Sequence, residues 1–289
     1  MSSRRLCKGG INLYLTFRRV ALISSLIGLV VLISCMIYRH NLASYTANLD
    51  TRAFSAGLLE PINSLEPAMI NCHQERLIAS AMYEGLVYYD EKAGSLKPLL
   101  AKSWKYSTDG KSLVLNLDKS IKFSNGKKLQ ASDVKRSWEN NFSKTMDWSN
   151  ISLFLSINGS SSRLEGKTAD ITGIKVVNDH TLKIVFDKPN AVFIYMLTNP
   201  IFWVYDDDDK VTPAPGTGPF MLTENKDNKQ FILLRNDKYH QGQPRLSALN
   251  ITIYSDEYQA FSDYKAGKLD YLDTIPLKEI KNIKNNNNH

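Results

Sequence analysis

The sequence predicts a mixed α/β or α+β fold, because short strands outnumber helices and most of the strands form hairpins. The clearest strand is 111–117, where Leu113, Leu115 and Leu117 alternate with polar residues after the turn dipeptide Asp109-Gly110. The 289 residues are 43% hydrophobic and 22% charged. This composition is typical of a globular protein, and the length allows one large or two medium domains.

The remaining elements follow from spacing and turn residues. The predicted helices are 74–83, 132–144 and 257–266, and the predicted strands are 102–106, 111–117, 173–177, 181–186, 230–235 and 249–254. Ser132 is a possible N-cap of the second helix, and Gly267 ends the third. We expect Trp104, Phe123 and Trp138 to lie in the hydrophobic core.

The N-terminus has the composition of a targeting segment. Residues 20–38 carry no charge, and the basic residues before them are Arg4, Arg5, Lys8, Arg18 and Arg19. Excluding these five from the 36 Lys and Arg leaves 31 against 29 Asp and Glu, so the formal charge of +7 belongs mostly to this end. The layout is typical of a secretory signal peptide, and the span is also just long enough to cross a bilayer as a helix.

The tetrapeptide Leu32-Ile33-Ser34-Cys35 resembles a bacterial lipobox, which predicts lipidation of Cys35. The alternatives are an uncleaved membrane anchor and a plain cleaved signal peptide. Each of the three places residues 40–289 outside the cytoplasm, because basic flanks stay inside. Residues 1–38 are therefore assigned to the signal or anchor, and the polar residues 39–57 to a tether.

No enzymatic or metal-binding motif is present. The chain lacks a P-loop, a G-x-S-x-G elbow and an H-E-x-x-H pair, and its five histidines have no ligand spacing. Four consecutive acidic residues, Asp206 to Asp209, cannot all point at one cation, so we expect a solvated loop there. No basic stripe is interleaved with aromatic residues, which argues against a nucleic-acid partner. We therefore expect no enzyme, no cofactor and no metal.

Nine short blocks occur in a fixed order between residues 64 and 270. They are Ser64-Leu65-Glu66-Pro67, Tyr83-Glu84-Gly85-Leu86, Pro98-Leu99-Leu100-Ala101-Lys102-Ser103-Trp104, Asp109-Gly110-Lys111, Ile121-Lys122-Phe123-Ser124-Asn125-Gly126, Ala131-Ser132-Asp133-Val134, Gly216-Thr217-Gly218-Pro219-Phe220, Arg235-Asn236-Asp237-Lys238-Tyr239 and Ala266-Gly267-Lys268-Leu269-Asp270. Together these blocks resemble the family 5 extracellular solute-binding proteins, the oligopeptide- and dipeptide-binding receptors of ABC importers.

The resemblance implies a periplasmic-binding-protein-like lobe with a mixed sheet, flanking helices and a smaller antiparallel subdomain. It covers residues 58–283, while 284–289 are expected to be a disordered tail. It also implies capture of an oligopeptide and delivery to ABC permease subunits, by a protein expected to be monomeric. Members of that family are roughly twice as long, so we expect the second lobe to be missing.

Ligand contacts can be carried over by position within these blocks. The residues implied are Asn71, Cys72, His73, Trp148, Asp273 and Thr274. The first three lie before the Y-E-G-L block, the tryptophan follows the A-S-D-V helix, and the last two follow the A-G-K-L-D block. Each of them could instead be a surface or hinge residue.

Three alternative functions stay open at this point. A nickel, haem or sugar binder on the same scaffold would keep the fold and change the ligand. A truncated or degenerate paralogue could act as a surface interaction protein without a role in transport. An exported enzyme has no motif in its support.

Overall fold

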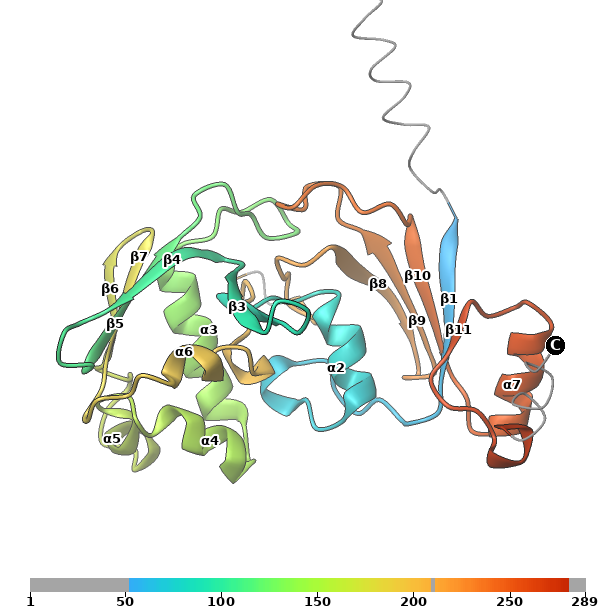
Figure 1. Ribbon diagram of the computed structural model, residues 1–289, viewed down its shortest axis with the longest axis horizontal. Helices are drawn as coiled ribbons and strands as arrows, with labels where there is room; N and C mark the ends of the chain where they lie inside the picture. Colours follow the sequence, from blue (N-terminus) through green and yellow to red (C-terminus); the bar gives the residue numbers. More distant parts are fainter. Residues whose placement is uncertain (1–51, 209–210, 281–289) are drawn as a thin grey trace, which may run out of the picture. The chain divides into compact units, whose positions relative to one another are not determined.

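The computed structural model describes residues 52–208 and 211–280, and it has the mixed α/β class expected from the sequence (Figure 1). The strands are β1 (Ala53–Leu58), β2 (Val87–Asp90), β3 (Ser95–Pro98), β4 (Ala101–Tyr106), β5 (Ser112–Leu117), β6 (Ile174–Asn178), β7 (Thr181–Val185), β8 (Phe220–Lys226), β9 (Gln230–Arg235), β10 (Ala248–Ile253) and β11 (Tyr271–Leu272). The helices are α2 (His73–Ser80), α3 (Ala131–Lys144), α4 (Trp148–Phe154), α5 (Ser160–Leu164), α6 (Phe193–Met196), α7 (Glu257–Lys265) and the 3₁₀ turns η1 (Pro67–Met69) and η2 (Pro200–Phe202).

One sheet has five strands in the order β11-β1-β10-β9-β8. Strand β1 lies between β11 and β10 and runs parallel to both, and it pairs with β10 from Ala53 to Leu58. The tether predicted for residues 39–57 is therefore wrong from Ala53 onward, where the backbone is an interior strand of the sheet. Small residues fit this place, because a Cβ added at Gly57 would lie only 2.7 Å from Leu269 Cδ1.

The second sheet is antiparallel, in the order β4-β5-β7-β6, and β2 and β3 form a separate hairpin. Both hairpins predicted from the turn dipeptides are present in the four-stranded sheet: β4 pairs with β5, and β6 pairs with β7. Helix α3 contacts β6. The helix begins at Ala131, one residue before Ser132, so its N-cap is Gln130 and not Ser132. The Gln130 N–H donates to Asp133 Oδ2 at 2.9 Å.

Two hydrophobic cores fill this part of the chain. The larger one lies between the four-stranded sheet and α3 and contains Phe123 and Trp138, both fully buried as predicted, with Trp104 packed half-buried against it. The smaller one packs Ile78 of α2 together with Leu58, Phe231 and other residues of the five-stranded sheet. Helix α2 is thus held by the second core.

Several sequence-based predictions fall on residues outside the described ranges. They are the signal or anchor segment 1–38 with Cys35, the tether residues 39–51 and the tail 284–289. Among residues 52–208 and 211–280, none of the helices has both the length and the apolar character that a membrane crossing requires.

Candidate functional site

The N-terminus of α2 is fixed by a buried carboxylate. Glu75 is fully buried, and its side chain accepts backbone N–H groups from Asn63 at 2.9 Å, Ser64 at 3.3 Å and Asn71 at 2.8 Å. Cys72 is the N-cap of the helix, and its Sγ lies 3.5 Å from the Glu75 backbone nitrogen. The loop that leads into α2 is therefore held by charge-assisted hydrogen bonds rather than by its own turn residues.

The C-terminal end of α2 is fixed by backbone packing. The Gly218 N–H donates to Met82 O, and the Phe220 N–H donates to Ala81 O, both at 2.9 Å. A Cβ added at Gly216 would lie 2.0 Å from Met82 O, which explains why the G-T-G-P block carries glycine there. Both ends of the helix are thus held, so the residues at its N-terminus have a defined position.

A hollow of about 320 Å³ opens beside the N-terminus of α2. Its walls are formed by Pro67, Ile70, Asn71, Cys72, His73, Arg76, Asn150, Asn199 and Pro200. The segment predicted from the sequence, Asn71 to His73, lies in this wall. Amide, thiol, imidazole and guanidinium groups meet here, and they offer hydrogen bonds in both directions to a polar ligand.

The second predicted contact segment lies next to the first. Gln74 Nε2 donates to Asp273 Oδ2 at 3.0 Å, which ties the first turn of α2 to the residues after β11. The Asp273 N–H donates to Gly57 O at 3.2 Å. Within the described residues its other oxygen, Oδ1, is buried and lacks a hydrogen-bond partner. Thr274 follows it and is exposed.

The third predicted contact is not in the wall of this hollow. Trp148 is the first residue of α4 and is 62% exposed, whereas Asn150 of the same helix lines the hollow. The side chain of Asp147 caps this helix by accepting the Ser149 N–H at 2.9 Å. The predicted contact Trp148 and the lining residue Asn150 therefore lie on the same helix, two positions apart.

Sequence reasoning also missed Arg76 and Asn199. Arg76 lies four positions after Cys72 on α2, so helical spacing alone could have placed it on the same face. Asn199 precedes η2, and its side chain accepts the Ile201 N–H at 3.0 Å. No spacing in the sequence links Asn199 to residues more than 120 positions earlier.

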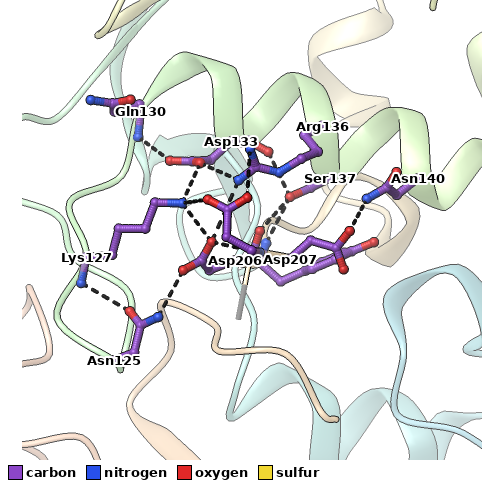
Figure 2. Close-up of polar contacts among 11 residues, drawn as sticks. Asn125, Lys127, Gln130, Asp133, Arg136, Ser137, Asn140, Asp206 and Asp207 are labelled. Atoms are coloured by element: carbon purple, nitrogen blue, oxygen red, sulfur yellow. Dashed lines mark hydrogen bonds and ion pairs between the residues drawn. The ribbon is translucent and has the colours of Figure 1, made fainter. Parts of the chain in front are cut away.

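A separate charge cluster surrounds Lys127 (Figure 2). Lys127 Nζ lies 2.7 Å from Asp206 Oδ1 and 3.1 Å from Asp133 Oδ1, and it also contacts Asp208. Arg136 Nη2 adds an ion pair with Asp133 at 2.7 Å. The prediction of a solvated loop at Asp206 to Asp209 is wrong for Asp206, which is only 1% exposed, because these cations draw it inward.

The oxygens of Asp133, Asp206 and Asp208 lie within 4.8 Å of one another, a spacing that suits a metal ion. The Lys127 ammonium, however, already lies among them. Burial opposes ionisation of Asp206, yet hydrogen bonds from Lys127 and Asn125 hold the pKa of its carboxyl below the usual value. The same carboxylates outweigh burial at Lys127 and raise the pKa of its ammonium. We read this cluster as structural.

The comparisons with known proteins agree with this fold. The model of the bacterial extracellular solute-binding proteins, family 5, matches residues 95–289. The chain is 27% identical over 226 residues to a dipeptide-binding protein of Lactococcus lactis, covering 73% of this chain and 41% of the relative. It is 30% identical over 198 residues to the nickel-binding protein NikA of Staphylococcus aureus, covering 68% of this chain and 36% of the relative.

The fold is similar to that of solved structures. The Escherichia coli murein tripeptide binding protein MppA superposes with a TM-score of 0.73 at 24% identity, covering 81% of this chain and 48% of that one. The chain spans less than half the length of the curated relatives and solved structures named here.

Proposed function

Because the chain belongs to the bacterial extracellular solute-binding proteins of family 5, we propose that it captures oligopeptides outside the cytoplasmic membrane and delivers them to the permease of an ABC importer. Binding is the whole of the mechanism: the ligand is held and released, and no bond is made or broken. The name of the Lactococcus relative supports a peptide as the ligand.

One observation carries the proposal. The hydrogen bond from Gln74 to Asp273 brings together two segments that lie about 200 positions apart in the sequence, and both were implied as ligand contacts. Beside them the hollow is lined mainly by uncharged polar groups. Such groups suit the amide and carbonyl groups of an extended peptide, whose backbone offers both donors and acceptors.

We also propose how the protein reaches its place of action. Residues 1–38 would export the chain and retain it at the membrane, through a lipid on Cys35 or through an uncleaved helix. Labelled palmitate distinguishes the two. Incorporation into the wild type and its loss in Cys35→Ala supports lipidation, whereas equal incorporation in both rules out this residue. An unlabelled wild type that stays in the membrane fraction supports the helix.

Isothermal titration calorimetry tests peptide capture. The full chain in detergent micelles is titrated with pools of random tri- to hexapeptides. The variants Asn71→Ala and His73→Ala are compared with Lys175→Ala, a control on the exposed side of β6. We expect the first two to weaken binding several-fold and the control to leave it unchanged. The absence of heat with every pool would contradict capture of peptides by this chain.

Nickel is the second candidate ligand, and a specific observation favours it. Cys72 and His73 are neighbours in the wall of the hollow, and thiolate and imidazole are good ligands for nickel. The NikA relative points the same way. A titration with nickel chloride separates the two ligands: binding of nickel that is lost in His73→Ala, without binding of any peptide pool, would replace the peptide proposal.

A further inference from the structure

A second hollow, of about 660 Å³, lies along the same helix as the candidate site. Five aromatic residues contribute to its wall: Tyr83, Tyr88, Tyr89, Trp203 and Tyr239. Of these, Tyr88 and Tyr89 of β2 remain 41% and 47% exposed. Tyrosine and tryptophan bind ligands well, because they present a broad apolar face and a polar tip.

The two hollows meet at Arg76. This side chain lies in both walls, and the consecutive residues Thr198 and Asn199 contribute one to each. Residues His73, Arg76 and Ser80 follow one another at helical spacing on α2, so they share one face of the helix. The two hollows therefore lie one after the other along this face of α2, with Arg76 at their boundary.

Arg76 is an available cation at the junction. Its side chain is exposed, and it has no hydrogen bond or ion pair within residues 52–208 and 211–280. The wall of the first hollow contains no carboxylate. Its neighbour in sequence, Glu75, already accepts three backbone N–H groups, as described above.

The carboxylates of the second hollow do not satisfy Arg76 either. Glu84 is buried, and it accepts the Tyr239 hydroxyl at 2.7 Å and lies 2.8 Å from His240 Nε2. Glu91 also lies in this wall and is exposed, but it forms no ion pair with Arg76. Among the described residues, none therefore occupies the guanidinium donors, which can bind an incoming group.

We propose that Arg76 binds a carboxylate of the ligand at the junction of the two hollows, while the adjoining residues of the ligand lie against Tyr88 and Tyr89. A guanidinium presents a planar fork of donors that matches a carboxylate, which a lysine ammonium does not. The ligand class is thus a peptide acid. Its carboxylate is supplied by the C-terminus or by an acidic side chain. This inference rests on the proposed peptide-binding function.

Three peptide pools test the inference by calorimetry on the full chain in detergent micelles. The first is a pool of random tetrapeptides with free C-termini, the second is the same pool amidated, and the third is the amidated pool with aspartate at the third position. We expect the wild type to bind the first or the third pool about tenfold more tightly than the second. The pool that is preferred identifies the source of the carboxylate.

Variants of α2 complete the experiment. Arg76→Gln should bind all three pools equally, and Arg76→Lys should recover only part of the preference, because it keeps the charge but not the fork. Leu77→Gln is the matched control: Leu77 is the exposed neighbour, lines neither hollow, and should keep the full preference. Equal thermal unfolding temperatures show that the folds are intact.

The outcomes separate this inference from the function on which it rests. A wild type that binds all three pools equally, or an Arg76→Gln variant that keeps the preference, overturns the role of Arg76 and leaves peptide binding standing. A wild type that binds none of the pools overturns peptide capture, and the role of Arg76 with it.

Discussion

Two polar regions of this protein differ in how completely their groups are paired. We call the cluster around Lys127 saturated because its two almost fully buried carboxylates, Asp133 and Asp206, both pair with cations, although Asp208 in the same cluster is exposed. The region at the N-terminus of α2 is open, and Asn71, His73 and Arg76 are exposed. Saturated groups stabilise a fold, whereas groups left with free donors and acceptors are available to a ligand.

The contrast also explains why the acidic cluster is not the functional site. It has the acidic residues that a metal site would need, and its oxygens lie close together. A protein ammonium nevertheless occupies the centre (Figure 2). The α2 region has fewer charges, but the side chains of Arg76 and His73 line hollows and are not paired with other described residues. Availability, and not charge density, distinguishes the candidate site.

The largest effect is expected from removing the cation at the centre of the saturated cluster. Among the described residues, Lys127→Met leaves the buried carboxylates of Asp133 and Asp206 with Arg136 as their remaining cation, so the free energy of unfolding should fall by about 3–5 kcal/mol. Urea denaturation measures it. Lys119→Met, at an exposed position, should change stability by less than about 0.5 kcal/mol. A Lys127→Met variant as stable as the control would show that the cluster is not stabilising.

A smaller loss of stability is expected from a change at Glu75, the buried residue that holds the loop beside the candidate site. In Glu75→Gln one acceptor oxygen is replaced by a donor that faces backbone N–H groups, and the unfolding free energy should fall by about 2 kcal/mol. Because the Asn71 N–H is one of those groups, ligand affinity should fall as well. Urea denaturation and calorimetry on the same sample measure the two effects. A loss of stability without a loss of affinity would show that Glu75 does not position the site.

Local patterns predicted the elements whose pairing is local. Strand β9 begins and ends at the predicted residues, Gln230 and Arg235, because polar residues bound its run of four apolar residues on both sides. The sequence predicts a tether where strand β1 lies, because the small residues of this segment have no strand-like pattern. Their strand conformation comes from two parallel neighbours more than 190 positions later in the chain.

The candidate site could be predicted only in part, because its contacts also join residues that are far apart in the sequence. The family resemblance implied ligand contacts at Asn71 to His73 and at Asp273, whereas the hydrogen bond from Gln74 to Asp273 that brings these segments together was not visible in the sequence. The burial of Asp206 could not be predicted, because its partner Lys127 lies 79 positions earlier. An acidic run is normally solvated, and only the tertiary arrangement of cations overrides that expectation.

Acid should weaken the saturated region. The pKa of Asp206 is lowered in the folded state, so its contribution to stability is present at neutral pH and is lost as the pH falls through that lowered value. Urea midpoints measured from pH 6 down to pH 3 should therefore decline. The decline should be shallower in Lys127→Met, which lacks the hydrogen bond that lowers this pKa. Parallel curves for the two proteins would contradict the assignment.

The smallest effect on stability is expected from a substitution in the open region. This substitution separates the two regions best, because it should lower affinity without lowering stability. His73→Ala removes an exposed ring that has no hydrogen bond or ion pair in the part of the chain that the structure describes, so the unfolding free energy should change by less than about 0.5 kcal/mol. Peptide affinity should nevertheless fall several-fold, because the ring lies in the wall of the hollow. Lys127→Met should behave in the opposite way, with lower stability and, under conditions where it stays folded, unchanged affinity. If His73→Ala lost stability and kept its affinity, the open region would be structural, and the distinction between paired and available groups would not locate the site.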